Sequence, residues 1–377
     1  MKQIIVYSCG DSTDVSTWSN VPYLFTKTLE DKGFTLYRVD ISPHKRLNRL
    51  FNTLSYYICK RLLKLRACPE FHRTGLHRFL TYRKIKEATK ASPKAEFNLF
   101  LSYAFYNPYS TKPNVLWCDW TDAMVIERLG RSPKWYERKS LKHEEKVLKN
   151  ADLVYSLFPV CATQMQNTYK RPVYHLNRNV INSVFEGKFD VRDAVMEKQQ
   201  SNVILFVGNL RYQGAARELI RIFYQLKKDI PNVELHIIGM TDKQLGVNQD
   251  GIFCHGYLHK NVKDECDTYY SLMMRAKVFV NSTPTWGGYS STIEAMYYGC
   301  PIIVSPYDDF VSEFGRNIPF GTYITEQSML CDLVKEILQS QQYEQLSYAA
   351  HNAVKDYTWS NYIDSFLESL HQHKVLQ

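Results

Sequence analysis

The sequence lacks several features that would place it in other classes of protein. No run approaches the roughly 18 apolar residues that a membrane-spanning helix needs, so we expect any membrane contact to be peripheral. The nine cysteines form no CxxC pair or other metal-ligand spacing, and the N-terminus shows no signal-peptide pattern. Because an odd number of scattered cysteines is typical of reduced thiols, we expect a cytoplasmic protein.

The excess positive charge is concentrated in one segment. The 377-residue chain has a net charge of +9, but residues 41–95 contain 14 Lys or Arg and two acids, a net of +12. The remaining 33 basic and 36 acidic residues give a net of −3. From Leu47 to Leu65 apolar residues recur at three- and four-residue steps, which predicts an amphipathic helix. Two interpretations stay open: the helix lies on an anionic membrane surface, where each Lys or Arg contributes about 1 kcal/mol, or it faces the core and its basic face is solvated.

Short apolar runs alternate with amphipathic stretches along the whole chain. The runs predict strands at residues 2–8, 35–40, 97–103, 114–118, 151–156, 203–207, 233–238 and 252–256, and a strand followed by an Asn-rich turn at residues 173–182. Helices are expected between them, for example over residues 21–32 and from the loop after Gly208 to about residue 228. This alternation predicts an α/β protein with two doubly wound domains and parallel sheets. We expect the domains to cover residues 1–185 and 186–356, with a C-terminal helix over residues 357–377.

Residues 281–301 contain the strongest functional signal. This segment lies between two apolar runs, and Pro284, Gly287 and Gly288 predict a loop that leads into a helix beginning near Ser291. A helix start has unpaired N–H groups and a positive dipole end, so it favours anions. The segment therefore predicts a phosphate-bearing ligand at residues 287–292.

Two further loops are expected at the same sheet edge, at residues 208–214 and 256–259. Arg211 could pair with a diphosphate, and Glu294 could accept two hydroxyls of a ribose. Together with the Ser290, Ser291 and Thr292 hydroxyls, these residues predict a nucleoside diphosphate site with no obligatory metal. Alternatives remain for both charged residues: Glu294 could only close a capping box with Ser291, and Arg211 could be a surface residue.

Asp119 follows the predicted strand at residues 114–118. A polar residue at the carboxyl end of a parallel strand is typical of a ligand-binding edge. The alternative is that Asp119 caps the helix that follows it. Gly10 occupies a similar position after the first strand and is a candidate for the same edge.

Five segments resemble the retaining glycosyltransferases of family 4, which have the GT-B fold. They are residues 206–214, 234–239, 253–258, 276–282 and 287–301. The resemblance is strong over residues 202–315 and weaker at residues 151–156. Residues 357–362 resemble the family's C-terminal tail, whose helix crosses back to the first domain. The resemblance implies two Rossmann-like domains that face each other across a cleft.

The resemblance also implies an activity. A UDP or GDP sugar would be bound by the C-terminal domain and a glycan or lipid-linked acceptor by the N-terminal domain. The enzyme would be a hexosyltransferase that retains configuration without a metal, in the synthesis of a surface polysaccharide, O-antigen, capsule or lipopolysaccharide. It would work in the cytoplasm, with peripheral contact to the anionic inner face of the inner membrane and no nucleic-acid partner.

The family's site residues transfer to this sequence one by one. Glu294 matches the second, ribose-binding Glu of the donor loop, whereas the first Glu falls on Trp286. The family's Gly-Arg and following Lys fall on Gly208-Asn209 and Gln213, so Arg211 would have to supply the charge. Asp119 corresponds to the family's N-domain His and, with Glu294, is the predicted catalytic pair. The predicted donor contacts are Gly10, Gly208, Asn209, Arg211, Gln213, Tyr257, Leu258, Trp286, Gly287, Gly288, Tyr289, Ser290, Ser291, Thr292 and Glu294.

Two other functions are compatible with the same patterns. Another GT-B enzyme, such as a sugar-nucleotide epimerase, would use the donor site but would not need a basic lipid-facing helix. A nucleic-acid-binding protein would use the basic segment, although the sequence shows no known motif for reading bases.

Overall fold

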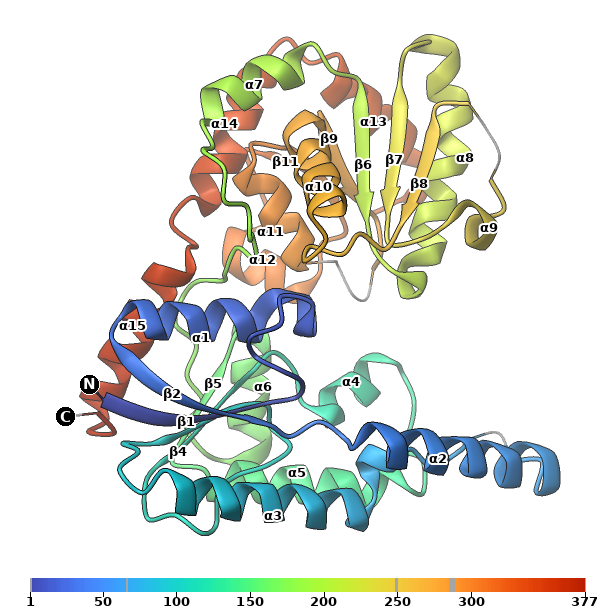
Figure 1. The fold of residues 1–377 in the computed structure, drawn as a ribbon. Coiled ribbons are helices and arrows are strands. Elements are labelled where there is room, and N and C mark those ends of the chain that lie inside the picture. Colours follow the sequence, from blue (N-terminus) through green and yellow to red (C-terminus); the bar gives the residue numbers. More distant parts are fainter. Residues whose placement is uncertain (1, 66, 248–249, 285–288, 377) are drawn as a thin grey trace. The chain divides into compact units, whose positions relative to one another are not determined.

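The computed structural model describes residues 2–65, 67–247, 250–284 and 289–376 (Figure 1). The chain forms two compact units. Unit 1 comprises Met1–Asn179 and Tyr362–Gln377, and unit 2 comprises Val180–Asn361. The sequence prediction had placed the corresponding boundaries at residues 185/186 and 356/357. The last helix, α15 (Trp359–Gln372), begins in unit 2 and continues into unit 1.

Unit 1 is built on a five-stranded parallel sheet in the order β2-β1-β3-β4-β5. Its strands are β1 (Lys2–Ser8), β2 (Phe34–Asp40), β3 (Asn98–Leu101), β4 (Asn114–Cys118) and β5 (Leu153–Ser156). All four residues of β3 and of β5 are buried, as expected for parallel strands covered on both faces. The strand order reverses between β1 and β3, which marks the carboxyl ends of these strands as the natural ligand edge.

Helices cover both faces of this sheet (Figure 1). They are η1 (Thr17–Asn20), α1 (Val21–Asp31), α2 (Lys45–Tyr56), η2 (Tyr57–Leu62), η3 (Phe71–Arg73), α3 (Gly75–Ala91), α4 (Asp122–Arg128), α5 (Glu137–Asn150) and α6 (Pro159–Tyr169). The end of α15 completes the unit: the Phe366 ring lies 5.4 Å from that of Phe25 and 5.1 Å from that of Tyr155. Trp117 Nε1 donates to the Tyr362 hydroxyl at 2.6 Å, which fixes α15 on the sheet by a buried polar contact.

Unit 2 contains a six-stranded sheet in the order β11-β10-β9-β6-β7-β8, parallel at every pairing. Its strands are β6 (Val203–Val207), β7 (Glu234–Ile238), β8 (Ile252–Gly256), β9 (Val278–Asn281), β10 (Ile302–Val304) and β11 (Gly321–Tyr323). The apolar strand residues of β9 and β10 are buried, and so are those of β6 apart from Val207 at its end. This pattern is the one that parallel strands need when helices lie on both faces.

The helices of unit 2 pack on the two faces of that sheet. They are α7 (Val191–Gln199), η4 (Leu210–Tyr212), α8 (Gln213–Asp229), α9 (Asp242–Leu245), α10 (Lys263–Arg275), α11 (Tyr289–Tyr297), α12 (Asp308–Phe314), η5 (Gln327–Met329), α13 (Leu330–Leu338) and α14 (Tyr343–Val354). One core cluster joins α8 and α13 to the strands through residues such as Phe223, Leu226 and Val334. Figure 1 shows α10 on the opposite face. The prediction of two parallel α/β domains is therefore confirmed.

Most predicted elements agree with the structure to within one or two residues, but two expectations are wrong. Residues 173–182 form no strand, and only Tyr174 bridges to Tyr155. Asn177 has a φ of 54°, a left-handed conformation that fits the Asn-rich turn predicted in this range. The core-facing interpretation of the amphipathic helix is also wrong, because Leu50 and Leu54 on α2 are exposed. Within the described residues, no helix combines the length and apolar character needed to cross a bilayer.

Candidate active site

The strongest candidate site in unit 2 lies where the strand order of its sheet reverses. β6 comes first in this sheet and lies between β7 and β9. In open α/β sheets, ligands bind at the carboxyl ends of the strands at such a reversal. The structure therefore directs attention to the loops that follow β6 and β9.

Three predicted strand-end glycines lie close together at this edge. The Gly208 amide donates to the Ile238 carbonyl at 2.9 Å, and the Gly239 amide donates to the Gly256 carbonyl at 2.6 Å. A Cβ atom on Gly239 would lie 2.4 Å from the Gly208 carbonyl oxygen, and the φ of Gly239 is +102°. Only glycine at residue 239 allows the two loops to approach this closely.

A cavity of about 410 Å³ opens at the same place, between the start of α8 and the end of β9. Of the residues predicted to contact a donor, Arg211 lines this cavity. The described lining residues are Arg211, Tyr212, Gly214, Ala215, Glu218, Ser282, Thr283, Pro284 and Gln327. No role had been predicted for Ser282, Thr283 or Gln327.

The β9 side of the cavity presents polar atoms with unmet hydrogen-bonding capacity. Asn281 Nδ2, Ser282 Oγ and Thr283 Oγ1 are buried and have no hydrogen-bond partner among the residues that the structure describes. A buried polar atom without a partner costs roughly 1–3 kcal/mol. Such a cluster is typical of a surface whose partners are supplied by a bound polar molecule.

The opposite side of the cavity is suited to an anion. Gly214 belongs to the first turn of the 17-residue helix α8, where amide groups point along the helix axis with the positive end of the dipole. The Asn209 side chain accepts from the Arg211 amide at 3.0 Å, which shapes the turn that leads to Arg211. Glu218 also lines the cavity, but it is paired with Arg221 at 2.6 Å. A diphosphate could therefore lie between Arg211 and the start of α8.

The other residues predicted on this side have different surroundings. Gln213 is the first residue of α8, and its Nε2 donates to the Gln244 carbonyl at 2.7 Å. Tyr257 is exposed beyond β8, with its ring 4.8 Å from that of His259, and Leu258 is half-buried. Because β8 is the edge strand of the sheet, these two residues lie two strands away from β6.

The predicted helix in the focal segment is α11, whose described residues run from Tyr289 to Tyr297. Ser291 and Glu294 both belong to this helix. Of the predicted contacts, Trp286, Gly287 and Gly288 lie outside the described residues. Tyr289 is buried, with its ring 5.8 Å from that of Tyr307.

Glu294 is the centre of a buried polar network. Its carboxylate accepts from Lys260 Nζ at 2.9 and 3.1 Å and from the Tyr269 hydroxyl at 2.8 Å. Only 2% of the Glu294 side chain is exposed. Lys260 Nζ also lies 4.2 Å from the centre of the Tyr269 ring, a favourable position for a cation. The carboxylate is thus fixed in place by a cation that the sequence analysis missed.

A second contact connects the start of α11 to the segment that opens unit 2. Asn182 Nδ2 donates to Ser290 Oγ at 2.8 Å, and the Asn182 carbonyl accepts from Lys260 Nζ at 3.2 Å. Trp359 Nε1 donates to Asn182 Oδ1 at 3.2 Å. Thr292, which was predicted as a hydroxyl donor at this helix start, is completely buried. Asn182 and Lys260 were both missed because they lie 108 and 34 residues from the groups that they contact.

The two site residues predicted in unit 1 lie at the carboxyl edge of its sheet. Gly10 follows β1, and its amide donates to Asp40 Oδ1 at 3.0 Å. Asp119 follows β4, and its carboxylate accepts from the Trp120 amide at 2.7 Å and from Cys118 Sγ at 3.3 Å. The side chain of Asp119 is half-buried, and loss of solvent raises the pKa of its carboxyl group. An Asp with a raised pKa is suited to accept or share a proton.

Metal-ligating side chains do not gather in the described part of the chain. Over these residues, no group of three or more His, Cys, Asp or Glu side chains is arranged to hold a metal ion. His236 and His255 do lie close together, with Nδ1 of the first 3.0 Å from Nε2 of the second. They lie on β7 and β8 and make no contact with the cavity lining.

Comparison with known families agrees with this assignment of the site to unit 2. Residues 201–340 match the family model of Glycosyl transferases group 1. This range contains β6, β9, α8, α11 and every residue that lines the cavity. No curated protein sequence matches the chain.

Solved structures resemble the chain over almost its whole length. Sucrose-phosphate synthase from Thermosynechococcus elongatus has a TM-score of 0.62 at 16% identity, covering 99% of this chain and 100% of that one. WaaG, a glycosyltransferase involved in lipopolysaccharide biosynthesis, has a TM-score of 0.60 at 14% identity, covering 97% and 99%. A putative UDP-N-acetylglucosamine 2-epimerase from Listeria monocytogenes has a TM-score of 0.59 at 11% identity, covering 99% and 97%.

A fourth similarity is partial, because the chain spans 58% of the length of TarM, with a TM-score of 0.56 at 12% identity over 76% of its own residues. At these identities the similarity establishes the fold and leaves the activity open. The chain has the GT-B fold of two Rossmann-like units, and its second unit matches the glycosyl transferases group 1 domain.

Proposed function

We propose that this protein is a glycosyltransferase that moves a sugar from a nucleotide-sugar donor, bound by unit 2, to an acceptor bound by unit 1. The single observation that supports this proposal most strongly is the cavity at the strand reversal of unit 2. Arg211 and the start of α8 lie on one side, and on the other lie Ser282 and Thr283, whose hydroxyls have no partner in the described part of the chain. A nucleoside diphosphate needs a cation-rich end and a set of polar partners, and this cavity offers both. The glycosyl transferases group 1 match over residues 201–340 supports the same choice.

In this proposal Arg211 and the amides of α8 neutralise the leaving diphosphate as the bond between sugar and phosphate breaks. The start of α11, with Ser290 and Ser291, is the second candidate for contact with the phosphates. Glu294 is the candidate for the ribose hydroxyls. Because Lys260 and Tyr269 already engage its carboxylate, ribose binding would have to share or replace one of these contacts. In this proposal Arg211 and the helix dipole neutralise the diphosphate charge without a metal ion.

Asp119 is the candidate group for the acceptor side of the reaction. Its carboxyl group, with a raised pKa, would orient or deprotonate the acceptor hydroxyl that attacks the sugar. Attack from the face that the nucleotide leaves would retain configuration. The acceptor we propose is a glycan or lipid-linked sugar in the assembly of a surface polysaccharide, such as lipopolysaccharide, at the cytoplasmic face of a membrane.

Calorimetric titration of the purified protein with a panel of UDP and GDP sugars tests the donor site. We expect Arg211→Ala to weaken donor binding by tenfold or more and Glu294→Gln to weaken it as well. Arg217→Ala is a matched control, because Arg217 is an exposed arginine of α8 that is not part of the cavity lining. Donor affinities for Arg211→Ala and Glu294→Gln equal to those of Arg217→Ala and the wild type would exclude the site assignment.

A sugar-nucleotide epimerase is the second candidate function, because a putative UDP-N-acetylglucosamine 2-epimerase shares the fold over 99% of this chain. The two activities differ in what they require. A transferase releases nucleoside diphosphate only when an acceptor is present, whereas an epimerase changes the free nucleotide sugar without one. Incubation with each donor in the absence of an acceptor, followed by chromatography of the nucleotide sugars, separates them.

A further inference from the structure

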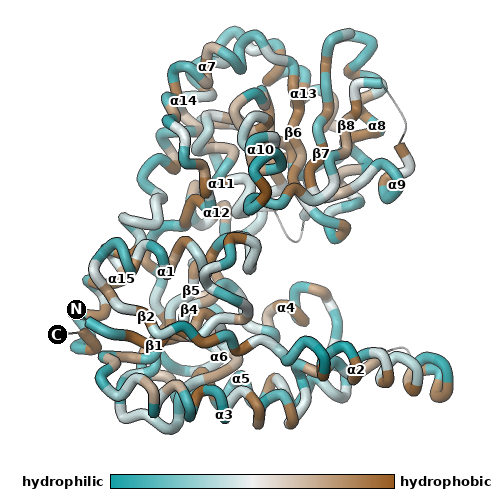
Figure 2. Tube along the Cα trace, viewed as in Figure 1, coloured by the Kyte–Doolittle hydropathy of each residue, from teal (hydrophilic) through white to brown (hydrophobic). Residues whose placement is uncertain are grey.

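A segment of unit 1 extends away from its sheet and is composed differently from the rest of the surface. We call it the basic arm and define it as residues 45–65, which comprise α2, the π-helix η2 and the three residues after it. Figure 1 shows α2 projecting beyond the strands of the unit, and Figure 2 shows hydrophilic and hydrophobic positions alternating along it. Between residues 41 and 69 the sequence contains no Asp or Glu.

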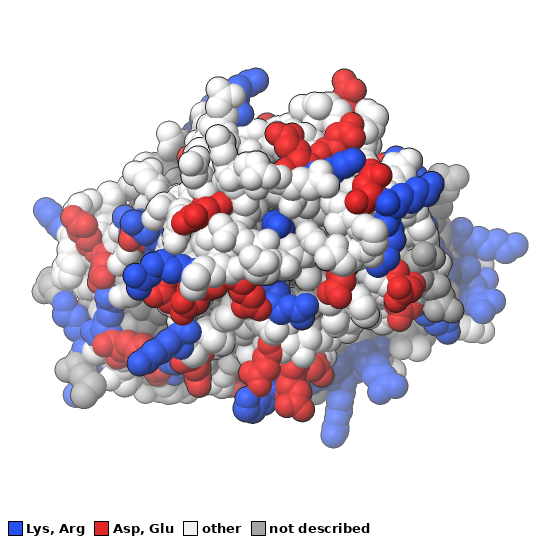
Figure 3. Space-filling model, turned by 90° about the horizontal axis from the view of Figure 1, so that it is seen from above, with Lys and Arg blue, Asp and Glu red and all other residues white. Residues whose placement is uncertain are grey.

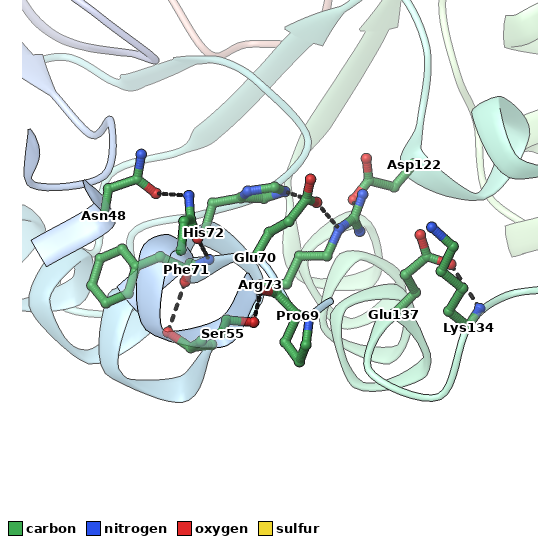
Figure 4. Close-up of polar contacts among 12 residues, drawn as sticks. Asn48, Ser55, Pro69, Glu70, Phe71, His72, Arg73, Asp122, Lys134 and Glu137 are labelled. Carbon is green, nitrogen blue, oxygen red and sulfur yellow. Dashed lines mark hydrogen bonds and ion pairs between the residues drawn. The ribbon is translucent and has the colours of Figure 1, made fainter. Parts of the chain in front are cut away.

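One face of the arm attaches it to unit 1. Ser55 Oγ donates to the Pro69 carbonyl at 2.8 Å, as Figure 4 shows, and the Phe71 amide donates to Asn52 Oδ1 at 3.0 Å. The ring of Phe51 lies 5.7 Å from that of the buried Phe71. The segment that receives these contacts is itself fixed, because Arg73 binds Asp122 at 2.7 Å. The arm is therefore a docked element of unit 1 with a defined orientation.

A second face of the arm is apolar and exposed. It contains Leu47, Leu50, Leu54, Tyr57 and Ile58, which recur at the spacing of one helix face. Leu50 and Leu54 are 68% and 55% exposed, and Leu62 beyond them is 63% exposed. Scattered apolar residues on a surface need no explanation, but a contiguous stripe on one helix is typical of an interaction surface.

A third face is basic. Arg49 lies four residues after Lys45 and three after Arg46, on the side of α2 between the attached face and the apolar face, and Lys60 continues this side along η2. All four are exposed, and Arg61 and Lys64 add two more exposed cations near the end of the arm. On the surface drawn in Figure 3, by contrast, basic and acidic side chains are interspersed. The arm thus combines uniform positive charge with an adjoining apolar stripe.

We infer that the basic arm binds the surface of an anionic lipid bilayer, with the apolar stripe among the acyl chains near the headgroups and the basic face against the lipid phosphates. Of the partners considered, only an anionic bilayer would engage both the apolar and the basic face of the arm. A nucleic acid would engage the cations but not the leucines, and an apolar protein groove would engage the leucines but not a row of cations. Binding of the arm to a bilayer does not depend on the proposed function. Only the further step, in which the membrane brings a lipid-linked acceptor to unit 1, rests on it.

Flotation of the full-length protein with vesicles tests this inference. The vesicles contain about one third phosphatidylglycerol in phosphatidylcholine, or phosphatidylcholine alone. We expect flotation with the anionic vesicles only, and a loss of binding as salt rises. Leu50→Ser/Leu54→Ser and Arg46→Gln/Arg49→Gln should each lower the partition coefficient at least tenfold, because each basic residue contributes about fivefold.

Two control variants keep the test specific. Leu129→Ser removes an exposed leucine outside the arm, and Arg217→Gln/Lys228→Gln removes two exposed charges from unit 2. Both should float like the wild type. The arm variants change only exposed side chains, so their circular dichroism spectra and melting temperatures should match the wild type.

The remaining outcomes overturn the inference. Absence of flotation at low salt, or flotation that is equal for the arm variants and the controls, excludes the bilayer as partner. Binding to single-stranded RNA without flotation would assign the arm to a nucleic acid. A dimer in sedimentation that Leu50→Ser/Leu54→Ser dissociates, without flotation, would assign the stripe to a second copy of this chain.

Donor titration of the same proteins without vesicles separates this inference from the proposed function. The arm variants should bind nucleotide sugar with wild-type affinity. Flotation of a protein that binds no nucleotide sugar would overturn the proposed function alone. Donor binding by a protein that does not float would overturn the bilayer inference alone.

Discussion

Lys260 Nζ lies 2.9 Å from Oε1 of Glu294, and both side chains are largely removed from solvent. The lysine comes from the loop after β8 and the glutamate from α11, so the pair connects two segments at the carboxyl edge of the unit 2 sheet. Removal of one partner leaves the other charge buried without its counterion, which costs on the order of 3 kcal/mol.

Glu294→Ala is therefore expected to destabilise unit 2 as well as to impair donor binding. Urea unfolding should show a loss of roughly 3 kcal/mol for Glu294→Ala and a comparable loss for Lys260→Met. The double variant Lys260→Met/Glu294→Gln should lose less than the sum, because neither charge remains. Additive losses in the double variant would mean that the two groups do not interact in solution.

Thr283→Val tests the unpaired hydroxyl in the cavity. Valine matches the shape of threonine and removes a buried oxygen that has no partner in the described part of the chain. The unfolding free energy without ligand should stay the same or rise by up to about 1 kcal/mol, because an unmet polar group is lost. Donor affinity should fall about tenfold, roughly 1.4 kcal/mol, because the hydroxyl can no longer bond to the nucleotide.

The matched control for this variant is Thr111→Val, at an exposed position between β3 and β4 in unit 1. It should change neither quantity beyond experimental error. A Thr283→Val protein that is strongly destabilised without ligand would show that the hydroxyl already has a partner in solution.

The positions of the strands along the chain could be predicted from the sequence, whereas the side-chain contacts of the site could not. Apolar runs such as residues 203–207 and 252–256 are local signals, and the strands appear there as expected. The partner of Glu294 depends on Lys260, which lies on another loop and has no sequence pattern of its own. The cavity lining also depends on residues that are far apart in the sequence, since Gln327 lies beyond β11 and lines the cavity together with Arg211.

The exposure of the basic arm was also open at the level of sequence. Leucines at helical spacing predict an amphipathic helix but do not say what covers its apolar face. The attachment of α2 through Phe51, Asn52 and Ser55 uses a different face from that of Leu50 and Leu54. Long-range contacts to Pro69 and Phe71 therefore decided the outcome.

Glu144 predicts a pH dependence of stability for unit 1. Its carboxyl group accepts from the Asp122 amide at 2.7 Å at the start of α4. Burial raises the pKa of this carboxyl group to about 8, and the nearby Asp122 charge is the second cause. Since the folded pKa exceeds the ordinary Glu value of 4.5, the folded state binds the proton more tightly than the unfolded state. Stability is then greatest below this value and is lost as pH rises to about 8, by at most about 1.4 kcal/mol per pH unit.

Thermal melts between pH 5 and pH 8 measure this effect. The wild type should lose melting temperature over this range, and Glu144→Gln should lose less because the titrating group is gone. Glu145→Gln is the control, since Glu145 is an exposed neighbour paired with Lys149. Equal slopes for wild type and Glu144→Gln would contradict the assigned pKa.

Gly239→Ala tests the close approach of the loops after β6 and β7. The added Cβ would lie 2.4 Å from the Gly208 carbonyl oxygen, at a φ of +102° that side chains rarely adopt. We expect a loss of roughly 2–4 kcal/mol in unfolding free energy and a weaker donor affinity, because the Gly208 turn leads to Arg211. Gly246→Ala is the comparison: it has a positive φ of 73° but no atom within 4 Å of the Cβ position. A loss no larger than that of Gly246→Ala would show that the loops can separate at little cost.

Asp119→Asn tests the proposed acceptor-side base. The substitution keeps the size of the side chain and an acceptor for the Trp120 amide, so the fold should be preserved. If the Asp119 carboxylate takes the proton from the hydroxyl of the acceptor sugar, the kcat of the variant should fall by about 100-fold or more while its donor affinity stays unchanged. The raised pKa adds a second readout, because the wild-type rate should increase with pH through a value above that of an ordinary Asp and the variant should lack this step. A fully active Asp119→Asn enzyme would leave Asp119 with a structural role, in which its carboxyl group fixes the turn after β4 through the Trp120 amide and Cys118 Sγ.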